Sequence, residues 1–256
     1  MNILLTNEAG CFTPGVITLA KALSMKHRVV IVAPLNPSNN AGHSLTMGGA
    51  PLRVKQYFLL NKVKIFSVNG TPVDCVTLAL DKILRVKPDL VISGISDRPC
   101  RGEKIYSSGV VSAAIEGTIH GIPSIALSTK VRDTSNEKVF ENIATAFARH
   151  LPYYMKHIPA STTLNINYPE KINASKIVCT HLTTGMIDDL YAHEVNPFGY
   201  TFYWLKPSLL GHSLACLDQR GDLYWGKKDF ITVVPLKLDL TAMSAIPQIE
   251  QGGIAL

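Results

Sequence analysis

Short apolar runs rich in β-branched residues recur along much of this 256-residue chain. Each run has the length of a single buried strand, and polar or glycine-rich segments separate one run from the next. Runs that are apolar on both faces are typical of parallel sheets, because helices cover both faces of such a sheet. The predicted strands are residues 2–6, 28–34, 62–68, 89–95, 124–129 and 164–168.

Apolar residues at helical spacing lie between these runs. Pro14 suits the first turn of a helix in which Val16, Leu19 and Leu23 share one face. The other predicted helices span residues 72–83, 111–121 and 139–147. The alternation of strand and helix predicts an α/β fold with a Rossmann-like, doubly wound, mostly parallel sheet.

Doubly wound sheets bind their ligands in the crevice beyond the carboxyl ends of the strands. The segments that follow three of the predicted strands are polar or rich in glycine, namely residues 6–10, 34–44 and 94–102. The second of them belongs to a loop, residues 35–50, that is longer than a simple connection requires. We therefore expect any chemistry to be found at these three strand ends.

After residue 170 the pattern changes to strand-like pieces separated by turn signals such as Asn196-Pro197 and Arg220-Gly221. The pieces are residues 177–182, 200–205 and 230–240. We interpret residues 171–256 as a β-rich extension with hairpins. It belongs to a single domain, residues 1–256, whose α/β core is residues 1–170.

The formal net charge of +6 favours anionic partners such as nucleotides. Specific nucleic-acid binding is not expected, because Lys and Arg form no long run and do not alternate with aromatic residues. The sequence has no apolar run of membrane-spanning length and no secretory signal at residue 1. Its five cysteines are scattered without a Cys-x-x-Cys pair. These features predict a cytoplasmic protein without a membrane segment.

Three groups of residues at the predicted strand ends carry a family signature. They read Thr6-Asn7-Glu8-Ala9-Gly10 with Pro14-Gly15, then Val32-Ala33-Pro34 with Ser44-Leu45-Thr46, then Ser93-Gly94-Ile95-Ser96 with Ser107-Ser108-Gly109 and Glu116-Gly117. Further matches are Gly70-Thr71-Pro72-Val73-Asp74, Leu164-Asn165-Ile166-Asn167 and Leu238-Asp239-Leu240-Thr241. In this order they resemble the SurE family of metal-dependent 5'/3'-nucleotidases, from residue 1 to about residue 245.

The resemblance implies a phosphatase that acts on nucleoside monophosphates with a divalent cation, Mg²⁺ or Mn²⁺. Such a cation neutralises the oxygens of the ester and lowers the pKa of a bound water. It prefers oxygen ligands, and carboxylates supply the necessary charge. The resemblance also implies a homodimer or homotetramer that is built through the C-terminal half of the chain.

The positions that bind the metal in the SurE family all carry different residues here. Glu8 keeps a carboxylate on a longer side chain, whereas Ala9 has no ligand atom where the family has a second aspartate. Asn39 and Ser96 stand where the family has serine and asparagine. Asp97 is a candidate replacement carboxylate. The candidate metal ligands are therefore Glu8, Asn39, Ser96 and Asp97.

More of the phosphate-binding pattern is retained. Ser107, Ser108 and Gly109 open a predicted helix whose N–H groups and dipole favour an anion, although a simple helix cap explains the same residues. Arg98 adds a guanidinium group, which matches phosphate geometry. The candidate ligand-binding residues are Ser107, Ser108, Gly109 and Arg98. The candidate catalytic residues are Glu8, Asn7 and Ser108.

Other residues of these loops have two interpretations each. Arg101 and Lys104 form either an ordinary basic loop or, with Arg98, a substitute for a missing cation. His43 is either a proton shuttle or a surface histidine. Cys100 replaces a family asparagine and is a poor group for orienting phosphate.

The leading interpretation is a SurE-like nucleotidase whose activity is weakened by the substituted metal ligands. The alternative is a non-catalytic paralogue that binds nucleotide or phosphate, or that serves as an oligomeric interaction protein. Loss of the carboxylate at position 9 predicts at most feeble phosphate release. The intact core pattern supports the reaction class of the family.

Overall fold

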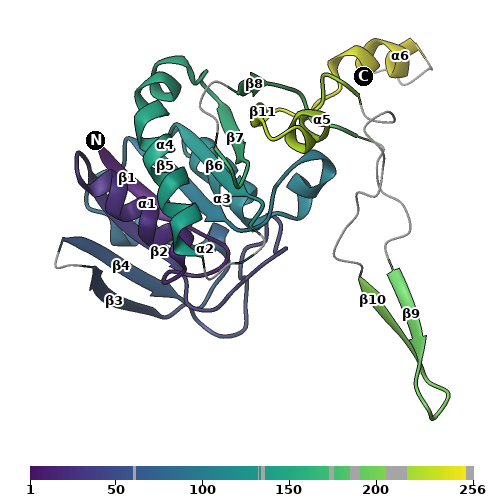
Figure 1. Ribbon diagram of the computed structural model, residues 1–256, viewed down its shortest axis with the longest axis horizontal. Coiled ribbons are helices and arrows are strands. Elements are labelled where there is room, and N and C mark those ends of the chain that lie inside the picture. The colour runs from purple at the N-terminus through teal and green to yellow at the C-terminus, as the bar shows by residue number, and fades with distance from the viewer. Residues whose placement is uncertain are drawn as a thin grey trace.

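The computed structural model describes residues 1–59, 62–131, 133, 136–172, 176–184, 191–205 and 218–251. Within these residues, one nine-stranded sheet has the order β3-β4-β2-β1-β5-β6-β7-β11-β8 (Figure 1). Its strands are β1 (Asn2–Thr6), β2 (Arg28–Pro34), β3 (Val54–Leu59), β4 (Val63–Val68), β5 (Leu90–Ser96), β6 (Ser124–Thr129), β7 (Thr162–Tyr168), β8 (Ile177–Cys179) and β11 (Ile231–Lys237).

Strand β1 lies in the middle of this sheet and pairs in parallel with β2 on one side and β5 on the other. Leu4 is the register partner of Val30 in β2 and of Val91 in β5. The parallel pairing continues from β5 through β6 to β7. The predicted doubly wound, mostly parallel α/β fold is therefore confirmed.

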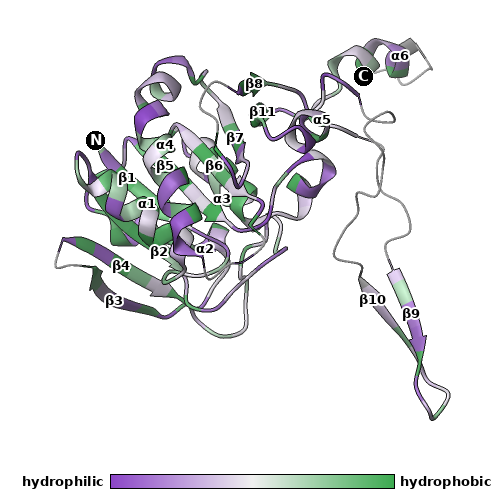
Figure 2. Ribbon diagram, in the orientation of Figure 1, coloured by the Kyte–Doolittle hydropathy of each residue, from purple (hydrophilic) through white to green (hydrophobic). Residues whose placement is uncertain are grey.

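Helices cover both faces of the sheet. Those that pack on the faces are α1 (Pro14–Ser24), α2 (Pro72–Leu78), α3 (Gly109–Ile119) and α4 (Glu137–His157). Helix α5 (Asp222–Lys227) lies beside β11, and α6 (Ile246–Gln251) lies away from the sheet (Figure 1). On one face, Leu19 of α1 and Phe147 of α4 share a buried cluster with Leu5 of β1. On the other, Val76 of α2 and Ala113 of α3 share a buried cluster with Leu4 of β1. Figure 2 shows hydrophobic residues along the central strands between these helices. Each fully buried Leu or Phe side chain stabilises the fold by roughly 1.5–3 kcal/mol.

Short helical turns adjoin several of these helices. A π-helical turn, η1 (Ala79–Ile83), extends α2, a 3₁₀ turn, η2 (Gly102–Ser107), leads into α3, and a second 3₁₀ turn, η4 (Met243–Ala245), precedes α6. Pro14 begins α1 after the N-cap residue Thr13, as predicted. A Cβ atom at Gly15 would collide with the backbone carbonyl oxygen of Ile95, so only glycine lets α1 begin directly beside the end of β5.

Strand β3 is absent from the sequence-based predictions. It pairs antiparallel with β4 at the edge of the sheet. Its residues are exposed or half-buried, so apolar and polar side chains mix without the alternation of a half-buried strand. Residues 35–50 form the predicted long loop and contain no strand.

The residues after 170 contribute both to the main sheet and to a separate hairpin. Strand β11 pairs antiparallel with β7 and parallel with β8, which places both beside the α/β core. The hairpin of β9 (Tyr191–Val195) and β10 (Thr201–Leu205) forms its own two-stranded sheet. In Figure 1 this hairpin projects away from the rest of the molecule.

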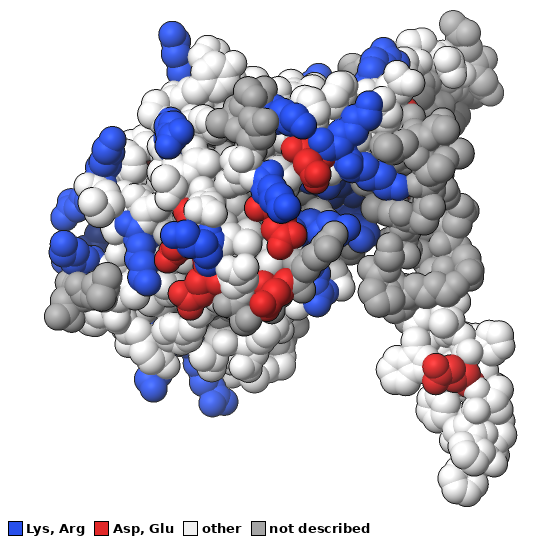
Figure 3. Space-filling view, in the orientation of Figure 1, with Lys and Arg blue, Asp and Glu red and all other residues white. Residues whose placement is uncertain are grey.

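Among the described residues, no helix is long and apolar enough to cross a membrane. On the face shown in Figure 3, basic side chains are spread widely, with acidic side chains between several of them. This distribution matches the positive net charge without forming a single basic stripe.

Candidate active site

The carboxyl ends of β1 and β5 form the floor of the candidate site. Because these neighbouring strands are parallel, Thr6 at the end of β1 lies beside Ser93 of β5. The residues that follow β1 and the last residue of β5, Ser96, therefore meet at one edge of the sheet. This is the edge that the sequence predicts.

Glu8 is the central charged group of this edge. Its side chain is buried, with 4% exposure. The hydroxyl of Ser96 donates to its Oε1 at 3.1 Å, and the backbone N–H of Gly109 donates to its Oε2 at 2.9 Å. Burial raises the pKa of the Glu8 carboxyl group, although the hydrogen bonds from Ser96, Gly109 and Val110 and the charge of Arg98 act in the opposite direction.

Ser108 caps the helix that approaches Glu8. Its hydroxyl accepts a hydrogen bond from the backbone N–H of Val111 at 3.2 Å, the standard role of an N-cap serine. The same oxygen lies 3.1 Å from the sulfur of Cys100. Burial, and next the negative charge of Glu8, raise the pKa of the Cys100 thiol to about 11. Cys100 is therefore a neutral thiol at physiological pH and not a nucleophile.

Asn7 is fully buried beside Glu8. Its Nδ2 donates to the hydroxyl of Thr13 at 2.9 Å, which ties the end of β1 to the start of α1. Its Oδ1 has no hydrogen-bond partner among the described residues. The hydrogen bond that Asn7 makes in this structure is thus one that supports the loop.

The second loop reaches the same edge through backbone contacts. The N–H of Ser38 donates to the carbonyl oxygen of Glu8 at 2.8 Å, and the N–H of Gly42 donates to that of Ser107 at 3.0 Å. The side chains of Asn39 and Ser107 are exposed at the rim. The loop lies beside Glu8 without placing a further charged group on it.

The third loop, which follows β5 within residues 94–102, carries the remaining predicted residues. The backbone N–H of Arg98 donates to the hydroxyl of Ser96 at 3.2 Å, while the Arg98 side chain is exposed. Asp97 is half-buried, and its carbonyl oxygen accepts from the N–H of Val131 at 3.3 Å. The structure thus joins Glu8, Ser96, Ser108 and Gly109 by direct or capping contacts. Among the described residues, the other predicted ones lie on the surrounding loops without a side-chain hydrogen bond to Glu8, namely Asn39, Asp97, Arg98 and Ser107.

The residues at this edge do not fit a divalent cation as they stand. Mg²⁺ and Mn²⁺ favour several oxygen ligands, with carboxylates among them. Here the carboxylate of Glu8 uses one oxygen for Ser96 and the other for Gly109, and Ala9 has no donor atom. Throughout the described part of the chain, no three His, Cys, Asp or Glu side chains are grouped in a way that could hold a metal ion.

Positive charge gathers around Lys104 instead. Burial lowers the pKa of the half-buried Lys104, and the nearby charges of Arg98 and Lys130 lower it further, against the effect of Cys100. Arg98 also acts electrostatically on Glu8. These three cations would attract an anionic ligand to this end of the sheet.

Arg101 does not belong to this group, contrary to the interpretation that placed it with Arg98 and Lys104. Its side chain is buried, with 8% exposure, against Gly226 of α5, where an added Cβ atom would collide with the guanidinium group. Burial lowers the pKa of Arg101, while Asp222 favours its charged form. Arg101 therefore holds the third loop to α5.

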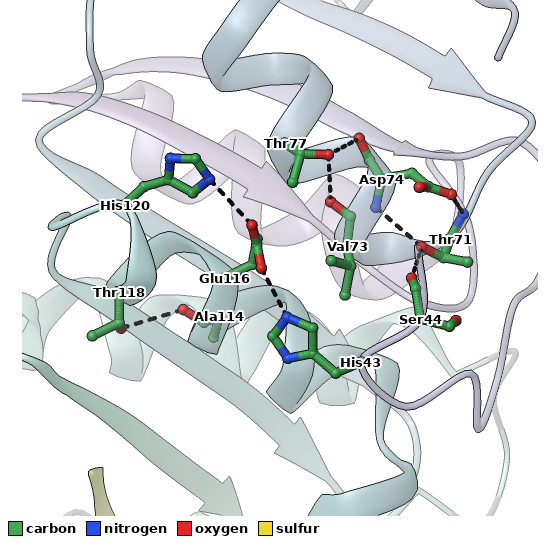
Figure 4. Close-up of polar contacts among 10 residues, drawn as sticks. All are labelled: His43, Ser44, Thr71, Val73, Asp74, Thr77, Ala114, Glu116, Thr118 and His120. Carbon is green, nitrogen blue, oxygen red and sulfur yellow. Dashed lines mark hydrogen bonds and ion pairs between the residues drawn. The ribbon is translucent and has the colours of Figure 1, made fainter. Parts of the chain in front are cut away.

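A second polar cluster anchors the long second loop and was not predicted as a unit. Glu116 of α3 binds two histidines: its Oε2 lies 2.8 Å from Nε2 of His43, and its Oε1 lies 3.1 Å from Nε2 of His120 (Figure 4). The hydrogen bond from His43 is the main cause that lowers the pKa of Glu116. His43 is thus a loop anchor, and the sequence signal was its place in a long loop.

Asp74 holds the same loop from α2. Its carboxylate accepts from both the backbone N–H and the hydroxyl of Thr46, at 2.9 and 2.6 Å. It also closes the capping box of α2 by accepting from the N–H of Thr71 at 2.8 Å, a helix start shown in Figure 4. The sequence predicts the position of Asp74 in the first turn of the helix but not its bonds to Thr46.

The fold and this edge define a doubly wound α/β protein whose candidate site lies beyond the carboxyl ends of its central parallel strands. The sequence model described as Survival protein SurE matches residues 3–189. The chain therefore belongs to the SurE family.

Relatives with high coverage support this assignment. The 5'-nucleotidase SurE of Thermoanaerobacter sp. (strain X514) is 35% identical over 248 residues, covering 96% of each chain. That of Desulforudis audaxviator (strain MP104C) is 38% identical over 259 residues, covering 98% of this chain and 97% of the relative. The crystal structure of the SurE protein from Aquifex aeolicus has a TM-score of 0.81 and 35% identity, and the match covers 98% of this chain and 99% of that one.

Proposed function

We propose that this protein is a phosphomonoester hydrolase of the nucleotidase type that acts slowly on nucleoside monophosphates. The observation that carries the proposal is the buried carboxylate of Glu8 at the end of β1, bonded to Ser96 and to the start of α3. It supports a catalytic edge at the place where doubly wound folds bind ligands. The similarity to proteins named 5'-nucleotidase supplies the reaction class.

The charges of the rim support a phosphate ester as the ligand. The rim cations are Arg98, Lys104 and Lys130. They interact electrostatically with one another or with groups of the site. A phosphate dianion would be drawn toward them. Glu8 is the acidic group that we expect to take part in hydrolysis. Among the described residues, it is the only acid at the β1–β5 edge that contacts both Ser96 and α3. Slow turnover follows because Ala9 removes the second carboxylate that the family resemblance implies.

A non-catalytic SurE paralogue is the second candidate. The observation that favours it is that both oxygens of Glu8 already accept hydrogen bonds from the protein, so the carboxylate has partners without a ligand. In this case the basic rim would bind nucleotide without hydrolysing it. The two candidates differ in turnover and not in fold.

Phosphate release from AMP, GMP and p-nitrophenyl phosphate, measured with Mg²⁺ or Mn²⁺, tests the proposal. We expect slow release that disappears in Glu8→Ala. Binding of AMP without any release would favour the paralogue. Rapid release that EDTA and Glu8→Ala both abolish would contradict the weakened site, because it would require an intact metal centre.

We also propose that the protein acts in the cytoplasm as a homodimer or homotetramer built through its C-terminal half. The support is the β9–β10 hairpin, which exposes large aromatic side chains while projecting from the molecule, namely Tyr191, Phe198, Tyr200, Phe202, Tyr203 and Trp204. Exposed apolar patches of this kind mark interaction sites. Light scattering should show an oligomer that Tyr203→Glu with Trp204→Lys dissociates, and a monomeric native chain would contradict it.

A further inference from the structure

The first N–H groups of α3 are all occupied by the protein itself. The first turn of a helix leaves its backbone N–H groups without helical partners, and this is where helices bind anions. In α3, the N–H of Gly109 donates to Glu8 Oε2 and the N–H of Val111 donates to the hydroxyl of Ser108. The N–H of Val110 also acts on the carboxylate of Glu8.

Glu8 reaches this position because its side chain is long and Gly109 is small. A Cβ atom added at Gly109 would lie 3.1 Å from Glu8 Oε2 and 3.3 Å from the Cβ of Glu8, which is tight packing. An aspartate at position 8 would be shorter by about 1.5 Å, one carbon–carbon bond, and could not keep both contacts in place. The carboxylate is further fixed by Ser96, and the Glu8 side chain is buried.

We infer that the Glu8 carboxylate is the resident anion of the α3 N-terminus and excludes phosphate from it in the native chain. The rim cations then attract an anionic ester that cannot reach the helix start while Glu8 stays in place. The inference rests on the proposed function in one respect: the proposed function is the reason for choosing phosphate as the ligand. It concerns binding, so it can hold even where hydrolysis is absent.

Binding of inorganic phosphate to the full-length chain tests this inference by calorimetry and by the NMR shift of the Gly109 amide. In the wild type, phosphate should leave the Gly109 amide resonance unchanged. In Glu8→Ala and Glu8→Ser, phosphate should shift this resonance and bind at least about tenfold more tightly, in line with helix-terminus effects on anions. Circular dichroism would establish that each variant is folded.

Two control variants separate occupation of the site from loss of charge. Glu8→Gln removes the charge but keeps the volume and a carbonyl oxygen that accepts from Gly109, so it should gain no phosphate affinity. Asp97→Ala removes one negative charge from the same end of the sheet without opening α3, and it should gain none either. Equal gains in phosphate affinity for Glu8→Ala, Glu8→Gln and Asp97→Ala would overturn the inference, because the loss of negative charge would then explain all of them.

The wild-type experiment stands by itself should the alanine variant fail to fold. A phosphate-dependent shift of the Gly109 amide in the native chain would overturn the inference directly. Failure of hydrolysis with AMP would count against the proposed function alone, since inorganic phosphate binding to Glu8→Ser does not require turnover.

Discussion

Asn167, near the end of β7, holds the backbone of Cys100 with both ends of its amide group. Its Oδ1 accepts from the N–H of Cys100 at 2.9 Å, and its Nδ2 donates to the carbonyl oxygen of Cys100 at 2.9 Å. Asn165 donates to the same carbonyl oxygen at 2.8 Å. Two asparagines in a buried strand thus position the third loop of the candidate site.

Replacing Asn167 with alanine should destabilise the protein. The change leaves the N–H of Cys100 and the hydroxyl of Ser128 with fewer partners inside the protein, and an unsatisfied buried polar group costs roughly 1–3 kcal/mol. Urea unfolding should show a loss in this range. Asn142→Ala, an exposed asparagine of α4, is the matched control and should change the free energy of unfolding by less than about 0.5 kcal/mol.

Restoring the oxygen ligands of the family pattern should restore metal binding. Glu8→Asp withdraws the carboxylate from α3, Ala9→Asp adds a second one, and Ser96→Asn adds an amide oxygen. Calorimetry with Mn²⁺ should show an affinity gain of about tenfold or more, the effect of roughly 1.4 kcal/mol of added ligand energy. The double variant without Ala9→Asp is the control and should gain less. No gain in the triple variant would show that the loops cannot form the site.

Cys100 should resist alkylation while Cys179 reacts. The pKa of the Cys100 thiol is raised to about 11, so roughly 0.1% is thiolate at pH 8, and its side chain is buried. Cys179 is exposed. Iodoacetamide followed by peptide mass spectrometry should label Cys179 first, and equal labelling of both in the folded protein would contradict this burial.

The raised pKa of Cys100 also predicts how stability depends on pH. Because the folded state favours the neutral thiol, its stabilising effect is complete below the ordinary pKa of 9.0 and is lost as pH rises toward about 11. The midpoint temperature of thermal unfolding should therefore fall less steeply with pH in Cys100→Ala than in the wild type between these two pH values. Parallel curves would show that this thiol does not titrate as the structure implies.

The contact between His43 and Glu116 should hold the long second loop in place. His43 is the main cause of the lowered pKa of Glu116. The contribution of this contact to folding stability is therefore present above pH 4.5, the ordinary pKa of the group, and is lost as the pH falls through the lowered pKa. His43→Ala should cost roughly 0.2–1 kcal/mol near pH 6, since the histidine is partly exposed. It should also speed chymotrypsin cleavage within residues 35–50. His157→Ala, exposed on α4, should change neither.

Local sequence patterns predict much of this fold because they record burial directly. The run Arg28–Pro34 is apolar on both faces and forms β2 with the predicted bounds. The spacing of Val16, Leu19 and Leu23 likewise predicts the buried face of α1. Strand β3 escapes such a prediction because an exposed edge strand lacks a burial pattern.

The sequence by itself determined the parallel core and the edge at which the candidate site lies, since these depend on residue type and order. Only the tertiary structure decided that Glu8 turns onto Gly109, that Arg101 is buried under α5 and that Asn167 holds Cys100. These pairs are separated by many residues along the chain. Their meeting depends on how strands and helices pack, which no local pattern encodes.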